Sequence, residues 1–256
     1  MISGIIIVKN EQRMIEGCLK SLSFCDEIVI VDNGSTDETV KICQKFTDKI
    51  YEIKTVDFSK MRNFGKDKAN GDWLLYIDAD ERISEELKTK ILQANKKQNL
   101  VGFEIKRKNN FFGHWMKSGG WENEYLLRLM RKKDLKEWRG ELHETAKVEG
   151  KIKRIEAPIL HYSHQDLSEC VTNTNVWSEI EANLRMKNNH PLMTTPRFIK
   201  LFIKELLTRV FGKTAWRDGV VGIIEAIYQS YSLLITYLKL WEKQNFENQN
   251  PNSNFK

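Results

Sequence analysis

The carboxylates of Asp78-Ala79-Asp80 are spaced so that they can hold a divalent cation. They follow directly on the apolar run 73–77, which has the length and composition of a buried strand. Carboxylates at positions i and i+2 beyond a strand can point the same way, and their hard oxygen atoms suit Mg²⁺ or Mn²⁺ better than zinc. A cation held there would in turn bind a diphosphate. A chain of this length carries about one Asp-x-Asp by chance, so the position of the motif matters more than its presence.

A second acidic segment, 32–37, follows the β-branched run 27–31. The carboxylate of Asp32 can accept two hydrogen bonds from a base or a ribose, and a glycine two positions later lets the chain turn. The same residues also suit a plain strand–turn–helix connection with a good helix cap and no ligand. Asn10-Glu11, after the first apolar run, is open to the same two interpretations.

Two candidates for other chemistry lie further along the chain. Arg62 gains a role if nucleotide phosphates lie near it, and is otherwise a solvated helix residue. Glu124 follows a loop rich in glycine and tryptophan. It is a candidate general base, because partial desolvation raises the pKa of a carboxylate toward working pH. The alternative is a hairpin with a surface ion pair between Glu124 and Arg128.

The segment 141–144 concentrates three ionisable groups. His143 is a candidate third ligand for a metal on Asp80, and Glu144 is a candidate base. A single His-Glu pair is more often a surface feature. His161 and His164 have no better claim to a role than His143.

The first hundred residues alternate between apolar runs and helical periodicity. Strands are expected at 5–8, 27–31, 50–53 and 73–77, with helices between them and Ser84 capping a further helix. This alternation predicts a mostly parallel sheet covered by helices. Because ligands of such sheets bind at the carboxyl ends of the strands, both acidic segments stand where a ligand would bind. Two more strands are expected at 101–105 and 125–130.

The C-terminal third has a different pattern. Beyond a polar helix expected at 167–186, apolar residues recur at helical spacing from Phe198 to Phe211, beside six basic residues and Glu205 alone. An amphipathic helix with basic flanks predicts contact with an anionic membrane surface, although packing on a protein core is the commoner use of such a stripe. The run 220–241 approaches spanning length, but its polar residues favour burial against protein or shallow insertion.

Bulk properties limit the class of protein. At 256 residues, with 41% hydrophobic and 30% charged residues, the chain suits one large domain or a domain with an appendage, and its net charge of +6 is modest. The four cysteines form no C-x-x-C pair, which indicates reduced thiols in the cytosol. The apolar lead 4–8 is too short for a signal peptide and is expected to be the first strand.

These segments, taken together, resemble family 2 glycosyltransferases with the GT-A fold. The match rests on the order and spacing of 5–11, 31–37, Arg62-Asn63 and 78–81, and it covers roughly residues 1–160. The segment 119–129, His143-Glu144 and the C-terminal aromatic and basic helices resemble a bacterial subgroup, the lipopolysaccharide-core glucosyltransferases.

The resemblance implies an α/β fold class, with a Rossmann-like nucleotide-binding sheet flanked by helices and a C-terminal amphipathic helical extension. The GT-A domain would span 1–165, with a nucleotide-sugar half to about residue 100 and an acceptor half at 101–165. A helical, membrane-associating extension would span 166–244, and the Asn-rich tail 245–256 is expected to be disordered.

The resemblance also implies roles for individual residues. The family's usual base is an aspartate, and this chain has Glu124, one methylene longer, at the corresponding place, with Glu144 as the reserve. The other roles are nucleotide-pocket lining for Val8, Asn10 and Glu11, uracil binding for Asp32, nucleotide or phosphate contact for Arg62, the ribose or sugar side for Asp78, and the metal for Asp80 with His143.

The expected activity is therefore an inverting, metal-dependent transfer of a hexose, with glucose preferred, from a UDP-sugar to a sugar hydroxyl of a lipid-linked glycan such as lipopolysaccharide core. Mg²⁺ or Mn²⁺ would be the cofactor. The enzyme would be cytoplasmic and peripheral on the inner face of the bacterial cytoplasmic membrane, on an anionic surface, with no nucleic acid partner. The oligomeric state is left open. The rival functions are a polyprenyl-phosphate sugar synthase, a nucleotidyltransferase and a non-catalytic membrane-bound scaffold.

Overall fold

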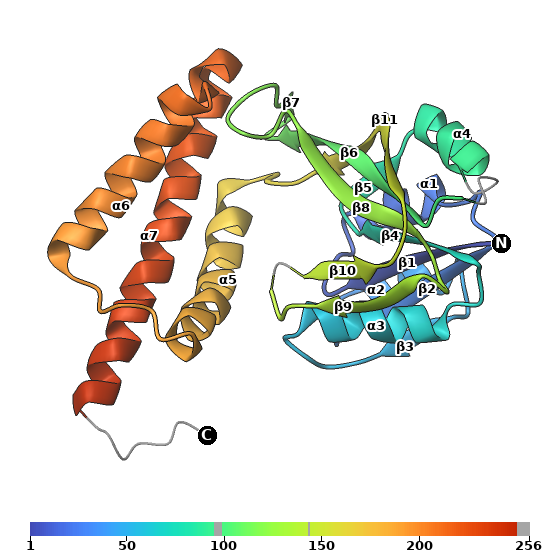
Figure 1. Ribbon diagram of the computed structural model, residues 1–256, viewed down its shortest axis with the longest axis horizontal. Coiled ribbons are helices and arrows are strands. Elements are labelled where there is room, and N and C mark those ends of the chain that lie inside the picture. Colours follow the sequence, from blue (N-terminus) through green and yellow to red (C-terminus); the bar gives the residue numbers. More distant parts are fainter. Residues whose placement is uncertain (95–98, 143, 250–256) are drawn as a thin grey trace. The chain divides into compact units, whose positions relative to one another are not determined.

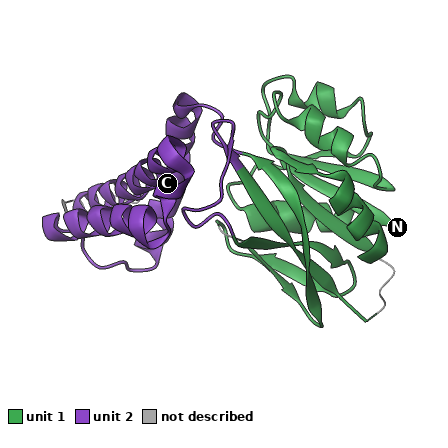
Figure 2. Ribbon diagram, turned by 90° about the horizontal axis from the view of Figure 1, so that it is seen from above, with its two compact units in different colours: residues 1–109, 123–162 green, residues 110–122, 163–256 purple. Residues whose placement is uncertain are grey.

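The computed structural model describes residues 1–94, 99–142 and 144–249, and the chain divides into two compact units (Figure 2). The sheet unit comprises residues 1–109 and 123–162. The helical unit comprises residues 110–122 and the chain from Ser163 onward. The sequence assigned all of 101–165 to one domain, whereas the structure groups 110–122 with the C-terminal helices.

A nine-stranded sheet forms the frame of the sheet unit (Figure 1). Its strands are β1 (Ile2–Val8), β2 (Glu27–Asp32), β3 (Ile50–Glu52), β4 (Trp73–Asp78), β5 (Glu81–Ile83), β6 (Gly102–Phe111), β7 (His114–Trp115), β8 (Glu124–Arg131) and β11 (Ile152–Tyr162). The order is β3-β2-β1-β4-β8-β6-β11-β5, with β7 paired to β6. The first four strands are parallel, and β8 runs antiparallel to β4. A separate antiparallel hairpin joins β9 (Leu135–Arg139) to β10 (Thr145–Val148).

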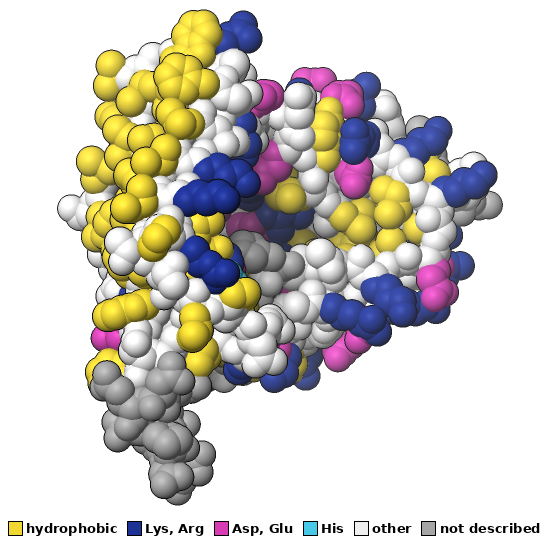
Figure 3. All heavy atoms as spheres, turned by 60° about the vertical axis from the view of Figure 1, so that its left-hand side comes forward, with side chains coloured by type: hydrophobic (Ala, Val, Ile, Leu, Met, Phe, Trp, Pro, Cys, Tyr) yellow, Lys and Arg dark blue, Asp and Glu magenta, His cyan; other side chains and the backbone are white. Residues whose placement is uncertain are grey.

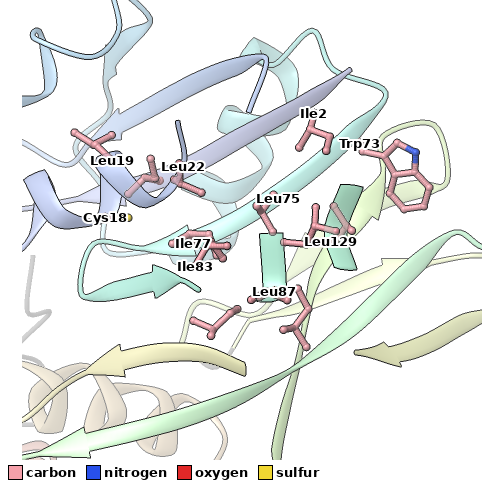
Figure 4. Packing of buried hydrophobic residues seen from close by; sticks show 14 of the residues in the cluster. Ile2, Cys18, Leu19, Leu22, Trp73, Leu75, Ile77, Ile83, Leu87 and Leu129 are labelled. Carbon is pink, nitrogen blue, oxygen red and sulfur yellow. The ribbon is translucent and has the colours of Figure 1, made fainter. Parts of the chain in front are cut away.

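Four helices connect or flank these strands: α1 (Ile15–Ser21), α2 (Thr39–Cys43), α3 (Phe58–Lys68) and α4 (Glu85–Ala94). The apolar runs of β1, β2 and β4 are buried along nearly their whole length, as expected of strands covered on both faces. Figure 4 shows Leu19, Leu75, Ile77 and Leu87 meeting in the core on one face of the sheet. On the other face Gly65 lets α3 lie close to β1, because a Cβ there would stand 2.6 Å from Ile5 Cγ2.

The helical unit consists of α5 (Leu167–Lys187), α6 (Thr195–Leu207), a π-helical turn (Thr208–Gly212), a 3₁₀ turn (Ala215–Asp218) and α7 (Gly219–Gln249). Its small core includes Ala182, Met193 and Leu240. The buried carboxylate of Asp218, the last residue before α7, is hydrogen-bonded to the segment 110–122. It accepts from the Lys117 N–H at 3.1 Å and from the Ser118 hydroxyl at 2.5 Å, and it contacts His114 Nε2 at 3.0 Å.

The strands and helices expected in the first hundred residues are confirmed, as are the two later strands and the polar helix that is α5. The tail is a correction. Helix α7 continues to Gln249, five residues into the stretch expected to be disordered, where the Asn245 side chain donates to the Trp241 carbonyl. Residues 250–256 lie outside the described residues.

Candidate active site

Two loops at the carboxyl ends of β1 and β2 are bonded to each other. Val8 and Asp32 are register partners, and the N–H of Asn33 donates to the Val8 carbonyl at 2.8 Å. Asn10 Oδ1 accepts from the Thr36 N–H at 2.7 Å. Nearby, the N–H of Glu11 donates to the Thr39 hydroxyl. The structure thus brings together Val8, Asn10, Glu11 and Asp32, the four residues expected to line a nucleotide pocket.

The carboxylate of Asp32 closes the turn that follows β2. It accepts from the N–H groups of Gly34 and Ser35 at 3.1–3.2 Å, and Gly34 adopts a positive φ of 76°. These bonds fit the interpretation as a plain turn. They leave the carboxylate further acceptor positions, because an ionised carboxylate has about four.

Asp78, the last residue of β4, is held by two arginines. Arg62 on α3 approaches Asp78 Oδ1 at 3.2 Å, and Arg128 on β8 approaches the same atom at 3.3 Å and also contacts Oδ2. Burial raises the pKa of Asp78, but the charges of Arg128 and Arg62 outweigh it and hold the pKa below its usual range. Arg62 also donates to Glu144 at 2.5 Å, so one guanidinium joins Asp78 to Glu144.

The network of charges continues through Glu81, whose side chain is fully buried. Glu81 Oε1 lies 2.9 Å from Arg128 and 3.5 Å from Arg107, and Oε2 accepts from the Asp78 N–H at 3.0 Å. Arg107 then binds Glu124 through two hydrogen bonds of 2.7 and 2.9 Å. The result is an alternating row of acids and bases that runs Glu144–Arg62–Asp78–Arg128–Glu81–Arg107–Glu124.

The alternative interpretation of Glu124, a surface ion pair with Arg128, is wrong. Glu124 is the first residue of β8, and it pairs with Arg107, whereas Arg128 is buried beside Asp78. Burial does raise the pKa of Glu124, but the charge and hydrogen bonds of Arg107 and a bond from Asn109 outweigh it, so the pKa lies below its usual value. The desolvation that favours a general base is therefore offset at this position.

Asp80 faces a histidine that the sequence did not single out. Asp80 Oδ2 lies 3.1 Å from Nε2 of His161 on β11, and Nδ1 of His161 lies 2.6 Å from Oδ1 of the fully buried Asn109. A signal for His161 was present in the sequence: Ile155, Ala157 and Ile159 alternate onto the buried face of β11, and His161 continues that alternation.

Asp80 and His161 bring one carboxylate and one imidazole side by side at 3.1 Å, a distance that a hydrogen bond between them also gives. These two side chains are the ones that would hold a divalent cation next to Asp78. Both side chains retain partial exposure, which leaves other coordination positions to water or phosphate oxygens. Among the described residues, no group of three or more acidic, histidine or cysteine side chains is arranged so that it could hold a metal ion. His143, the expected third ligand, lies outside them.

In the helical unit, the apolar stripe of α6 divides into two faces. Phe198 and Leu201 pack against the small core. Ile199, Ile203 and Leu207, four residues apart, are each about half exposed. Figure 3 shows hydrophobic side chains gathered along this part of the molecule beside lysines and arginines.

Beyond α6, the side chains of Phe211, Trp216 and Val220 are also exposed. By length and composition alone, the helical stretch Ala215–Phe246 could cross a membrane, a test that a core helix of a soluble protein also passes. The polar side chains of α7 include the buried Glu225, bonded to His164 at 2.9 Å, and the buried Gln244, which accepts from the Met193 N–H. These bonds fit a helix that packs within its own unit.

Known proteins resemble the chain over most of its length. A lipopolysaccharide core biosynthesis glycosyltransferase, LpsC of Rhizobium meliloti, is 28% identical over 94% of this chain and 92% of its own. An uncharacterized glycosyltransferase of Rickettsia conorii is 25% identical over 94% of this chain and 90% of its own. The crystal structure of S. aureus TarS 1-349 in complex with UDP-GlcNAc shares the fold at 14% identity, with a TM-score of 0.50 and coverage of 95% of this chain and 91% of that one.

The sequence profile of Glycosyl transferase family 2 matches residues 3–148, more than half of the chain. That range contains both acidic segments and every member of the alternating row of charges. The chain belongs to Glycosyl transferase family 2 and is a glycosyltransferase with the GT-A fold.

Proposed function

We propose that this glycosyltransferase is inverting and metal-dependent, and that it moves a hexose, with glucose preferred, from a UDP-sugar to a sugar hydroxyl of a lipid-linked glycan such as lipopolysaccharide core. The observation that carries the proposal is the pair Asp80–His161 beside the arginine-held Asp78, at the edge where β4 ends. The full-length similarity to LpsC supports the choice of acceptor class.

The nucleotide would bind on the two cross-bonded loops. Val8, Asn10 and Glu11 would line the pocket, and Asp32 would accept from the N–H of uracil with its remaining lone pairs. Asp78 would face the ribose or the sugar. Arg62 would contact the nucleotide or its phosphates, supported by its position between Asp78 and Glu144.

Asp80 and His161 would hold Mg²⁺ or Mn²⁺, and Mn²⁺ is the better match, because Mg²⁺ is bound almost entirely through oxygen ligands. When bound, such an ion acts as a Lewis acid that stabilises the negative charge developing on the leaving diphosphate. In this proposal His161 is the ligand beside Asp80, the role expected from the sequence for His143.

The acceptor hydroxyl needs a base, because it is not ionised before attack. Glu144 is favoured over Glu124. Both oxygens of Glu124 already accept from Arg107, and one of them also accepts from Asn109. Glu144 is bonded to Arg62 through Oε1. Its Oε2 would take the proton as the hydroxyl attacks the anomeric carbon on the face opposite the leaving group.

The helical unit would place the enzyme on the inner face of the bacterial cytoplasmic membrane. An outer row of Ile199, Ile203 and Leu207 would enter the interface, with Lys200 and Lys204 of the same helix contacting anionic headgroups. A lipid-linked acceptor would then present its sugar from the same surface.

A donor and acceptor screen tests the proposed activity. The purified chain is incubated with UDP-glucose, UDP-galactose or UDP-GlcNAc and a truncated lipopolysaccharide core, with Mn²⁺, Mg²⁺ or EDTA, and UDP release and product mass are measured. We expect transfer from one UDP-hexose that EDTA abolishes. Full transfer in EDTA would contradict metal dependence, and transfer only to polyprenyl phosphate would favour the synthase.

The base assignment has a matched pair of variants. Glu144→Gln should lower kcat for a sugar acceptor by about 100-fold or more, the range for loss of a general base, while binding of UDP with Mn²⁺ is retained. Glu124→Gln should lower kcat less. A larger loss of kcat in Glu124→Gln than in Glu144→Gln would assign the role of base to Glu124.

A further inference from the structure

A line of hydrogen bonds leads from Arg107 through two side chains to the imidazole of His161. Arg107 donates twice to Glu124. The amide nitrogen of Asn109 lies 3.0 Å from Glu124 Oε2, and its amide oxygen lies 2.6 Å from His161 Nδ1. His161 Nε2 then faces Asp80 Oδ2 at 3.1 Å. All five side chains belong to the sheet unit.

The chemistry of the groups fixes the direction of each bond in this line. Glu124 is a carboxylate paired with a guanidinium, so it can only accept. The group of Asn109 that lies next to Glu124 must therefore be its NH₂. The amide oxygen of Asn109 then faces His161. Asn109 is fully buried, so solvent offers no alternative partner. His161 must then carry its proton on Nδ1, because an oxygen at 2.6 Å requires a donor.

This tautomer has a consequence at the other ring nitrogen. With its proton on Nδ1, neutral His161 presents the lone pair of Nε2 to a carboxylate oxygen of Asp80. Two acceptors at this distance repel each other unless a metal ion or a second proton on the ring lies between them. In water, neutral imidazole prefers the opposite tautomer, with the proton on Nε2. In that form His161 would simply donate to Asp80 and offer no lone pair.

We propose that Asn109 and Glu124 are positioning residues that lock His161 with Nδ1 protonated and the Nε2 lone pair aimed at the cation site of Asp80. The inference rests on the metal site of the proposed function and gives Glu124 a part in it other than that of base. Groups that orient a metal-bound histidine in this way typically change metal affinity by about 10–100-fold when removed.

The tautomer is measured directly in the metal-free protein by long-range ¹H–¹⁵N correlation spectra of ¹⁵N-histidine-labelled samples, at about pH 8, where an ordinary histidine is neutral. His161→Gln identifies the His161 signals. His164, whose Nδ1 faces Glu225, and His114, whose Nε2 faces Asp218, serve as internal references of known orientation. We expect His161 to be protonated at Nδ1 and unprotonated at Nε2.

Two variants of Asn109 separate orientation from folding. Asn109→Asp combined with Glu124→Gln keeps an oxygen for Nδ1–H and gives the new carboxylate an amide N–H to accept from, so the tautomer should be retained. Asn109→Leu has a similar volume but no acceptor, so the proton should move to Nε2, and Mn²⁺ affinity measured by electron paramagnetic resonance with UDP present should fall about 10–100-fold. Glu124→Gln removes the carboxylate that orients Asn109 and should give a mixture of tautomers even if Asn109→Leu does not fold.

The two proposals fail in different ways. A wild-type protein with Nε2 protonated, or with both nitrogens protonated, would overturn the inference even if Mn²⁺ binds and transfer proceeds. The expected tautomer in a protein that binds no Mn²⁺ would leave the orientation by Asn109 and Glu124 standing and would refute the metal site of the proposed function. Unchanged tautomer populations in Glu124→Gln and Asn109→Leu would also overturn the inference.

Discussion

The two units of this glycosyltransferase differ in which side chains they bury and which they expose. In the sheet unit, Arg128 and Glu81 are buried together in a row of alternating charges, while the apolar side chains of β1, β2 and β4 are almost wholly inside. In the helical unit, the outer row of Ile199, Ile203 and Leu207 remains exposed, beside basic residues. An exposed apolar patch of this kind contributes little to the core of its own unit. Such patches are typical of surfaces that bind a partner.

The contrast indicates that the two units have different functions. Buried, hydrogen-bonded charges are costly to assemble and are typical of a site where ligand charge must be met with fixed geometry. Exposed apolar rows with basic neighbours are typical of an interface with lipid. We therefore expect the chemistry to belong to the sheet unit and membrane attachment to belong to the helical unit. The predictions below test that separation.

The largest expected effect is on the stability of the sheet unit. Arg128→Met leaves Asp78 and Glu81 without their main partner, and removal of one member of a buried ion pair costs about 3–5 kcal/mol. Hydrogen exchange should show the loss in peptides of β4 and β8. The matched control is Arg154→Met, an exposed pair with Glu104, for which the loss should be at most about 1 kcal/mol. Equal effects of the two variants would contradict a buried network.

The next largest effect is on activity. Asp80→Ala should lower kcat at saturating UDP-sugar and Mn²⁺ by about 100–1000-fold, equivalent to about 3–4 kcal/mol, because the proposed metal site would lose a ligand. Asp72→Ala, an exposed aspartate at the opposite end of β4, is the control and should retain wild-type turnover. Flotation with lipid vesicles should be the same for both. An Asp80→Ala enzyme with wild-type turnover would favour a different catalytic centre or a scaffold.

Acid should weaken the sheet unit through Glu27. Burial raises its pKa, but bonds from Lys49, Ser3 and the Asn70 N–H outweigh burial and lower the pKa to about 2. A lowered pKa stabilises the fold fully above the ordinary value near 4.5, and that contribution, at most about 3 kcal/mol, is lost as pH falls from 4.5 toward 2. Glu27→Gln should flatten the pH dependence of the free energy of unfolding over this window, whereas the exposed Glu52→Gln should not.

The smallest expected effect is on membrane attachment, and it should leave catalysis alone. Ile203→Glu with Leu207→Glu should lower binding to phosphatidylglycerol vesicles by about 10–100-fold, because the exposed half of each side chain is worth about 1 kcal/mol when buried in lipid. Donor hydrolysis in solution should not change. Ile152→Glu, a similarly exposed isoleucine of the sheet unit, is the control. Unaltered flotation of the double variant would place attachment elsewhere.

Short-range patterns predicted much of the fold and part of the site. β-branched runs and helical periodicity located β1 to β4 and the helices between them, because strands of a covered parallel sheet are apolar along their length. The ends of these strands then identified Asp32, Asp78 and Asp80 as site residues, because ligands of a parallel sheet bind at the carboxyl ends of its strands. β9, β10 and β11 do not follow the rule of continuous apolar residues, because charged residues interrupt their apolar positions.

The partners of the site residues could not be predicted in this way. Arg62 and Arg128 lie 66 positions apart in the sequence, yet both bind Asp78. The expected Glu124–Arg128 pair assumed that neighbours along a hairpin meet, whereas β8 pairs with β6 and so brings Glu124 to Arg107. Asp80 and His161 are 81 positions apart and meet because β11 pairs with β5.

The sequence by itself determined the family, the parallel half of the sheet, the acidic strand ends and the amphipathic character of α6, because each depends on residue type and local spacing. The tertiary structure decided which charge meets which, which face of α6 stays exposed and which histidine stands beside Asp80. Pairing between distant strands sets those contacts, and the order of strands in a sheet is not encoded in the period of any one of them.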